Sequence, residues 1–473
     1  MDRLVYGPAA FGALLVLITI GVYLPAVDAQ MVADDFVLVS GISFREAAAY
    51  WCDTFGFGRN EYRPLTALSF ALDRALWNGD PRGYHATNIA LHATVVVLVF
   101  LWLRRLSGEP WLAFLAALFF VVHPVHHSRV NWIAARDGTL SGVFRLLCLW
   151  AYTRHRQGAA PARSYSRFSV AMFAGSLLSY EGAAALPLVL GATELFSNPG
   201  VVLTRERIWE TLRRLRPFLL VFAAYLIFWN VLFGGSLGAY HLDPNPESAL
   251  RNYGRLLDTL AHGHQRWAGL LYLVAVVLGF RALRERWNLA WLSLLIVLLS
   301  YLPFCLLGGF AARFAYASAL GYCLLLALVL LGAARGSSRW RPLAAGGVAL
   351  GLFAYYTVEA RTRVFEWREA GEIAVSIPRQ LKEMHPALPH GAVLMFGGIP
   401  RMHRRAQVFP LGLVGVVERE YAGVSLQVES HERPLLEWAP RPAGPSPAPR
   451  YYFDYDPLRR RLVQLEAPGW VAN

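Results

Sequence analysis

Long apolar segments recur along most of this chain, and they limit it to folds that a lipid bilayer can hold. A run of about 20 apolar residues can cross the hydrocarbon core as one helix. Only 16% of the residues are charged, against about 25% in soluble domains. The sequence therefore predicts a polytopic α-helical membrane protein with about eleven transmembrane helices. The segments lie at residues 8–27, 87–103, 110–123, 139–153, 168–180, 182–196, 217–234, 267–280, 288–308, 315–333 and 343–357.

Arginine is concentrated in every second loop between these segments. Loops that stay in the cytoplasm hold the excess of Lys and Arg in membrane proteins, so we expect these loops and the N-terminus inside. The odd number of segments then places the C-terminal part outside. In a Gram-negative bacterium this predicts an integral inner-membrane protein with its outer face in the periplasm. The arginine-rich loops lie at residues 104–110, 153–167, 204–217, 281–287 and 335–341.

The net charge of +13 follows from the same arrangement. Positive loops match the anionic lipids of the inner leaflet. Because no basic patch is interleaved with aromatic residues, we expect no nucleic-acid partner. The first apolar segment is too long for a signal peptide, so we expect it to be retained as a span.

The chain changes character after residue 357. Residues 364–384 have a helical period, residues 391–400 (GAVLMFGGIP) are typical of a buried strand, and residues 451–466 predict a hairpin that turns at Asp456 and Pro457. We therefore expect a membrane domain at 1–357 and a small extracytoplasmic α/β domain at 358–473.

The first outer loop, about residues 28–86, carries Asp34 and Asp35 side by side. Each of two adjacent carboxylates raises the free energy needed to ionise the other. A loop of this length is usually functional or disordered, and its aromatic residues argue against disorder. The structural alternative is a helix N-cap in a solvated loop.

Other polar side chains also collect on the outer side. His85, Asn88 and His92 follow one face of a helix that enters the bilayer, and polar groups on a membrane helix point into the protein or a cavity. Buried structural hydrogen bonds are the alternative for these residues. The further candidates come from separate outer segments: Arg63, His123, His126, Arg136, Asp137, Glu181 and Arg313.

Two of these candidates have specific alternatives. Arg136 and Asp137 could form a structural ion pair instead of a ligand clamp. His126 and His127 could bind a metal, but adjacent side chains on a helix diverge and no Cys or His spacing frames them. We therefore assign no metal ligand.

The order of these motifs resembles the membrane region of GT-C glycosyltransferases. The likeness is to the transmembrane and tetratricopeptide-repeat (TMTC) O-mannosyltransferases and their bacterial relatives, and it covers roughly residues 10–335. The sequence departs from the family in two ways: a small domain follows residue 357 where the family has its repeats, and Tyr180 and Ala312 replace the Lys and Glu of the family pattern. The motifs are Asp34-Asp35 and residues 61–93, 117–142, 179–191 and 312–328.

This resemblance implies a GT-C fold and the transfer of a sugar from a polyprenyl-phosphate donor to an acceptor hydroxyl on the outer face, with inversion. One aspartate of the pair would be the general base and its neighbour would raise its basicity or orient it. Asp35 is slightly favoured over Asp34, although nothing in the sequence separates the two. A divalent metal is compatible with this chemistry but not required by it.

The same resemblance assigns roles to the other outer residues. Arg63, Arg136 and Arg313 are candidates for the lipid phosphate, because a guanidinium binds phosphate bidentately. His123 and His126 would assist, and Glu181 would position the sugar hydroxyls. The acceptor could be a protein, a lipid or a glycan.

Two other functions remain open from the sequence. A multi-pass transporter would need acidic or broken-helix sites near the bilayer midplane and an inverted repeat, neither of which is clear in the sequence. A non-catalytic membrane scaffold for envelope glycan assembly would tolerate loss of the aspartate pair.

Overall fold

The structure is a computed structural model. The predicted segment at 267–280 lies outside the residues that it describes. Those residues are 7–32, 34–39, 41–53, 61–159, 161–196, 204–233, 243, 245–261, 286–307, 309–335, 338–409, 413–435 and 449–466.

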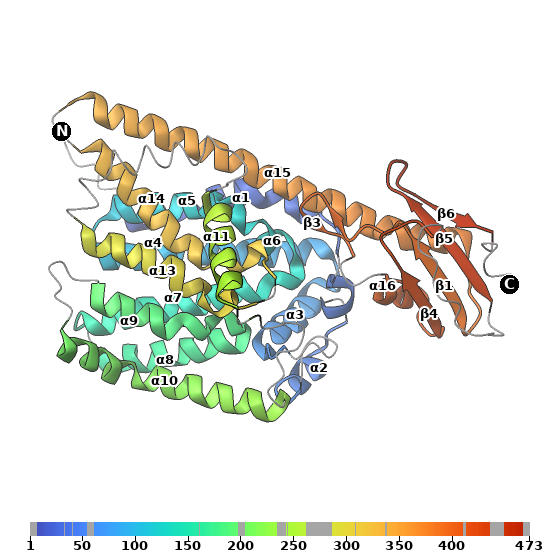
Figure 1. Ribbon diagram of the computed structural model, residues 1–473, viewed down its shortest axis with the longest axis horizontal. Helices are drawn as coiled ribbons and strands as arrows, with labels where there is room; N and C mark the ends of the chain where they lie inside the picture. The colour runs from blue at the N-terminus through green and yellow to red at the C-terminus, as the bar shows by residue number, and fades with distance from the viewer. Residues whose placement is uncertain are drawn as a thin grey trace.

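A bundle of long helices forms the larger part of the molecule (Figure 1). Every predicted apolar segment except 267–280 falls on one of its helices. Five described helices are long and apolar enough to cross a bilayer, or up to six if a bent pair in the segment 110–131 counts as one span. The number eleven remains a prediction. The helices are α1 (Pro8–Tyr23), α4 (Pro81–Ser107), α5 (Pro110–Val122), α7 (Arg136–Arg156), α8 (Ala162–Ser179), α9 (Leu186–Phe196), α10 (Arg205–Phe233), α13 (Trp287–Cys305), α14 (Ser318–Ala334) and α15 (Trp340–Met384).

The local sequence sets the ends of these helices. Helix α4 begins at Pro81, whose fixed φ suits the first helical turn, and the Asp80 side chain accepts a hydrogen bond from the Arg82 N–H at 3.0 Å. The helix ends at Ser107 and is capped by Gly108, whose φ of +70° is the left-handed conformation that glycine adopts readily.

Short helices and turns gather at the end of the bundle that is nearer the β-sheet, where α2, α3 and α6 lie in Figure 1. The first outer loop contains the short helix α2, which ends at Ala49. Four of the candidate residues lie on these short elements: Asp35, His126, Glu181 and Arg313. The short elements are η1 (Leu24–Asp28), η2 (Asp35–Val39), α2 (Phe44–Ala49), α3 (Pro64–Trp77), η3 (Pro124–His126), α6 (His127–Asn131), η4 (Ile133–Ala135), η5 (Glu181–Ala185) and η6 (Ala312–Ala315). Helix α11 (Pro246–Ala261) is drawn over the middle of the bundle in Figure 1.

The arginine-rich loops meet one another at shared carboxylates. Arg286 and Arg335 both pair with Glu109, and Arg156 and Arg214 both pair with Glu194. Two of these loops follow α4 and α7, at the ends of these helices that lie away from the sheet (Figure 1). The arginines are thus separated from the polar residues at the sheet end, as a positive-inside topology requires.

The C-terminal part is a small α/β unit, as expected. Its four-stranded sheet has the order β4-β1-β5-β6, with β1 parallel to both β4 and β5. The predicted buried strand is β1, and the predicted hairpin is the antiparallel pair β5-β6, in which Asp456 lies opposite Arg461. The elements are β1 (Ala392–Gly397), β2 (Met402–His403), β3 (Ala406–Gln407), α16 (Val414–Glu420), β4 (Leu426–Ser430), β5 (Arg450–Asp456) and β6 (Arg461–Leu465).

Helix α15 joins the two parts without a break. Its 45 residues span about 68 Å at 1.5 Å per residue, about twice the thickness of the hydrocarbon core. It runs along the bundle and continues to the sheet (Figure 1). The boundary expected at residue 357 thus falls inside one helix.

The sheet unit also packs on the outer loops of the bundle. Val32, Trp132 and Ala135 share a hydrophobic core with Trp367 of α15 and with the sheet. The rings of Trp132 and Trp367 stack with their centroids 5.8 Å apart. The segments that flank the aspartate pair are therefore held by the C-terminal part of the chain.

Candidate active site

The two adjacent aspartates have different surroundings. Asp35 is fully buried, and its carboxyl oxygens accept the backbone N–H groups of Val32 at 3.0 Å and of Ala134 at 2.7 Å. Burial raises the pKa of Asp35 to about 8, although these N–H groups oppose the shift. Asp35 therefore holds its proton near neutral pH. Asp34 keeps 5% of its surface exposed.

This environment predicts a pH-dependent stability. The pKa of Asp35 rises from 3.8 to about 8 on folding, so between these values the folded state binds more protons than the unfolded state. Stability then falls as the pH rises through this window. We expect the melting temperature of the wild type to decrease from pH 6 to pH 9, and that of Asp35→Asn to be lower but flatter. An equal slope in the two proteins would contradict the assignment.

The segment before the aspartates is held by a close contact with α15. A Cβ atom at Gly371 would lie 2.9 Å from both the backbone N and the backbone O of Gln30. Real Cβ atoms essentially never come this close, so only glycine lets α15 approach here without a shift. Gly371 thereby fixes the chain that leads to Asp34.

We expect Gly371→Ala to move this segment and to destabilise the fold by about 1–3 kcal/mol, the usual effect of overpacking. The rate of the expected transfer reaction should fall by more than the loss of stability explains, because the segment carries the aspartate pair. Gly351→Ala on the same helix is the matched control, since its Cβ would meet nothing within 4 Å. Thermal melting and initial rates of both variants test this, and equal behaviour would show that the contact is unimportant.

Arg63 lies at the centre of a buried group of carboxylates. Its Nε and Nη2 donate to the two oxygens of Glu181 at 2.9 and 2.5 Å. Its Nη1 lies 3.0 Å from a carboxylate oxygen of Glu61 and 3.0 Å from one of Asp137. The structure thus brings together three predicted residues, Arg63, Asp137 and Glu181, from three separate segments.

Asp137 links this group to a second arginine. Its other oxygen accepts from Arg129 Nη1 at 2.5 Å, and Arg129 also donates to the carbonyl oxygens of Ala135 and Arg313, at 3.1 Å each. The guanidinium carbons of Arg63 and Arg129 lie 5.0 and 4.6 Å from the centroid of the Tyr180 ring. Tyr180 therefore contacts both cations at favourable cation–π distances.

Arg136 is fully buried and its donors already have protein acceptors. It donates to Asn88 Oδ1 at 2.6 Å, to the carbonyl oxygens of Tyr84 and Ser69, and pairs with Asp73 at 2.5 Å. Asn88 in turn donates to the carbonyl oxygen of Trp132 at 3.2 Å. These contacts favour a structural role for Arg136 and Asn88.

The predicted histidines are also buried. His92 Nδ1 lies 2.9 Å from the Tyr316 hydroxyl, and His123 Nε2 lies 3.1 Å from the Leu260 carbonyl oxygen. The ring of His126 lies 5.2 Å from that of His92 and 4.6 Å from that of Tyr316. His85 is 1% exposed. Across the described ranges, no three His, Cys, Asp or Glu side chains are grouped so that they could hold a metal ion.

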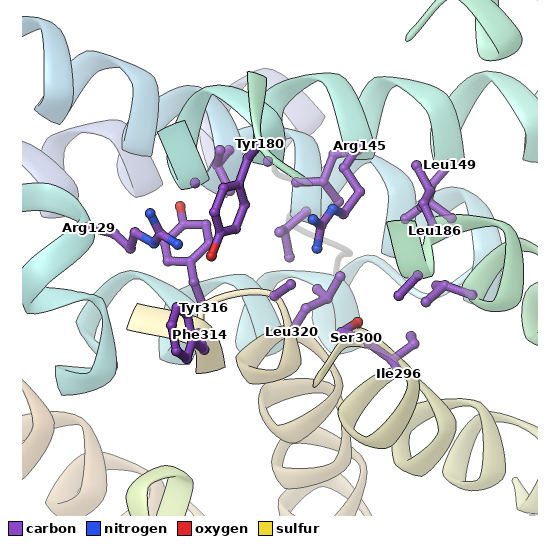
Figure 2. A pocket seen from close by; sticks show the side chains of 18 of the residues that line it. Arg129, Arg145, Leu149, Tyr180, Leu186, Ile296, Ser300, Phe314, Tyr316 and Leu320 are labelled. Atoms are coloured by element: carbon purple, nitrogen blue, oxygen red, sulfur yellow. The ribbon is translucent and has the colours of Figure 1, made fainter. Parts of the chain in front are cut away.

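A cavity lies among the bundle helices next to these groups, and its empty space, including the part open to solvent, is about 690 Å³. Most of its wall is aliphatic or aromatic, but Arg129, Arg145 and Arg313 also line it. Figure 2 shows Arg129 and Tyr180 toward one end of the cavity and Arg145 between them and the leucines. Of these three arginines only Arg313 was among the predicted site residues.

Two of the cavity arginines differ from all the others in the site. In the part of the chain that the structure describes, neither Arg145 nor Arg313 forms an ion pair with a carboxylate, and Arg145 Nε has no hydrogen-bond partner. Arg313 lies over the rings of Trp132 and Phe314. A cation in an apolar site needs an anion to offset its desolvation. The cavity therefore suits a ligand that joins an anionic group to an apolar chain.

No protein-family model matches this chain. Human protein O-mannosyl-transferase TMTC2 is 35% identical over 123 residues, which are 26% of this chain and 14% of the relative. Mouse protein O-mannosyl-transferase TMTC3 is 40% identical over 95 residues, which are 20% of this chain and 10% of the relative. The chain thus covers only a small part of these curated relatives. They confirm the resemblance to the TMTC O-mannosyltransferases.

Solved structures share the fold over most of the chain. ArnT from Cupriavidus metallidurans, bound to undecaprenyl phosphate, has a TM-score of 0.51 at 12% identity over 94% of this chain and 92% of that chain. The oligosaccharyltransferase of Archaeoglobus fulgidus has a TM-score of 0.57 at 11% identity over 90% of this chain and 65% of that chain. These are GT-C enzymes, so the expected GT-C fold is confirmed.

Proposed function

We propose that this protein is a membrane glycosyltransferase that moves a sugar from a polyprenyl-phosphate donor to an acceptor hydroxyl on the extracytoplasmic face. One observation carries the proposal: Arg145 and Arg313 line an apolar cavity and have no carboxylate partner in the described chain. A guanidinium forms strong, bidentate bonds with phosphate, and these bonds strengthen in a low dielectric. The aliphatic wall suits the isoprenoid chain of such a carrier.

The charged and the aliphatic parts of the cavity wall lie where the phosphate and the isoprenoid chain of one carrier molecule could contact them. Leu149 and Leu186 lie on the far side of Arg145 from Arg129 (Figure 2), and Val189 also lines the cavity. The first isoprene units would pack on these side chains while the phosphate meets the guanidinium groups. The fold neighbour ArnT binds undecaprenyl phosphate, which is a ligand of this chemistry.

In the proposed reaction the acceptor oxygen attacks the anomeric carbon as the bond from that carbon to the phosphate oxygen breaks. The acceptor proton passes to a carboxylate, and the carrier leaves as polyprenyl phosphate, whose charge Arg145 and Arg313 stabilise. A single displacement of this kind inverts the configuration of the anomeric carbon.

We assign the base to Asp34, which reverses the slight preference from the sequence. Asp35 is fully buried and both of its oxygens accept backbone N–H groups, so it has little capacity to take a proton from an acceptor. Asp34 is the member of the pair with residual exposure. In this proposal Asp35 anchors the loop and remains neutral near pH 7.

The remaining charged residues position the cavity wall. Glu181 engages Arg63 with both oxygens, so we assign it to holding Arg63 instead of the sugar hydroxyls. Asp137 joins Arg63 to Arg129, which donates to the Arg313 carbonyl oxygen. The ion-pair group thereby fixes the segment that presents Arg313.

We further propose eleven spans, with the arginine-rich loops in the cytoplasm and the sheet unit outside. The pairing of these loops at the end away from the sheet supports this orientation. In it, the aspartate pair and the sheet unit lie on the extracytoplasmic side.

Sugar transfer by the purified protein in nanodiscs tests the proposal. The nanodiscs receive a panel of radiolabelled polyprenyl-phosphate sugars together with envelope extract as acceptor source. Mannose is the first sugar to test, since the matched relatives are named O-mannosyl-transferases. We expect one donor to be consumed, with label in a new product and release of polyprenyl phosphate. If every donor remains intact, the protein is a scaffold or a transporter.

A further inference from the structure

A second, open groove lies between the aspartate loop and the C-terminal part of the chain. It contains about 1100 Å³ of empty space. Met31 and Phe36 line it on one side, and these residues flank the Asp34-Asp35 pair in the sequence. The C-terminal half of α15 and helix α16 form the opposite wall. The groove therefore lies beside the loop that carries the candidate base, on the side of the sheet unit.

Three cations line this groove: Arg379 and Lys382 of α15 and Arg419 of α16. Among the described residues none of them forms an ion pair with a carboxylate. Lys382 Nζ is held 4.1 Å from the Tyr421 ring centroid and donates to the Glu420 carbonyl oxygen at 3.3 Å. The lining also contains Glu383 and Glu420, so its formal charge is +1.

The walls of the groove favour a ligand that is recognised through side chains. The wall that α15 and α16 form is helical. It offers no strand edge on which an extended peptide could form a ladder of main-chain bonds. Cations set between apolar residues such as Met31 and Pro378 suit sugar rings that carry acidic groups.

From this arrangement we infer that the groove binds the acceptor, and that the acceptor is an anionic glycan whose carboxylate or phosphate groups pair with Arg379, Lys382 and Arg419. The inference rests on the proposed function, because it places the acceptor next to Asp34. It adds the chemical class of the substrate. Bidentate pairing of guanidinium with an acidic sugar would orient a neighbouring hydroxyl toward the aspartate loop.

Binding to the full-length protein in nanodiscs, without any donor, tests this inference. The probes are trigalacturonate, the neutral galactotriose and a glutamate-rich nonapeptide. We expect trigalacturonate to bind about tenfold more tightly than each of the other two at low ionic strength, and less tightly as salt is added. Equal binding of trigalacturonate and galactotriose, or tighter binding of the peptide, would overturn the inference.

Charge-reversal variants locate the site. Arg379 and Arg419 are exposed, so the double variant Arg379→Glu and Arg419→Glu should fold. We expect it to lose the preference for trigalacturonate. Arg459→Glu is the matched control, since Arg459 is a surface arginine of the same unit with 84% of its side chain exposed, and it should keep the preference.

The result is independent of sugar transfer. If trigalacturonate does not bind preferentially but the protein still consumes a polyprenyl-phosphate sugar, the acceptor inference fails and the proposed function stands. If trigalacturonate binds in the groove but every donor remains intact, the groove is a binding site for acidic sugars and the transferase proposal fails.

Discussion

Asp34→Asn should lower the rate of sugar transfer by about 10³-fold, within the range that a general base contributes. The amide keeps the shape of the side chain but cannot take the acceptor's proton. Because asparagine has nearly the size of aspartate and Asp35 makes the buried backbone contacts, we expect the fold to be retained. Initial rates at saturating donor, with melting temperature measured in parallel, test this prediction.

Asp35→Asn is the matched comparison for this variant. An amide has one oxygen, so one of the N–H groups of Val32 and Ala134 would face an NH₂ group instead of an acceptor. An unsatisfied buried donor costs about 1–3 kcal/mol. We therefore expect Asp35→Asn to lose stability and Asp34→Asn to lose rate. The reverse pattern would return the role of base to Asp35, and full activity in both would remove the pair from the mechanism.

Arg145→Met should weaken the binding of polyprenyl phosphate by about 100-fold, because a charged hydrogen-bonded contact is worth about 1.5–3 kcal/mol. The cavity wall is mostly apolar, so methionine should fit it and stability should be unchanged or higher. Loss of a cation that has no carboxylate partner leaves no buried charge behind. Carrier binding and thermal melting measure the two effects.

Arg136→Met is the control with the opposite expected result. Arg136 is fully buried and pairs with Asp73, and removing one partner of a buried pair costs about 3–5 kcal/mol. This variant should melt well below the wild type. If Arg145→Met is the unstable protein, or if it binds polyprenyl phosphate as tightly as the wild type does, Arg145 is a structural residue.

Much of the fold follows from patterns that the sequence carries locally. Apolar segments fall on helices because each must satisfy its own backbone hydrogen bonds in the bilayer. The hairpin at Asp456 and the buried strand β1 are likewise local signals. The change in composition near residue 357 suggests a boundary between two domains. The helical period nevertheless continues through it, and α15 is one helix.

The candidate site is harder to predict because its contacts join distant segments. Nothing in the sequence indicates that Arg136 meets Asp73 and Asn88, or that Glu181 meets Arg63. Arg145 did carry a signal that was overlooked. It is a lone guanidinium within the apolar segment 139–153, and an ionisable residue inside a membrane segment usually marks a functional site.

The anomeric configuration of the product tests the central claim most directly. The purified protein is given a polyprenyl-phosphate sugar of known configuration and an acceptor, and the linkage formed is assigned by nuclear magnetic resonance. Direct displacement of the carrier phosphate, with Asp34 as base, predicts one product of inverted configuration and an equal amount of polyprenyl phosphate. A retained configuration, or no product with any donor, would contradict it.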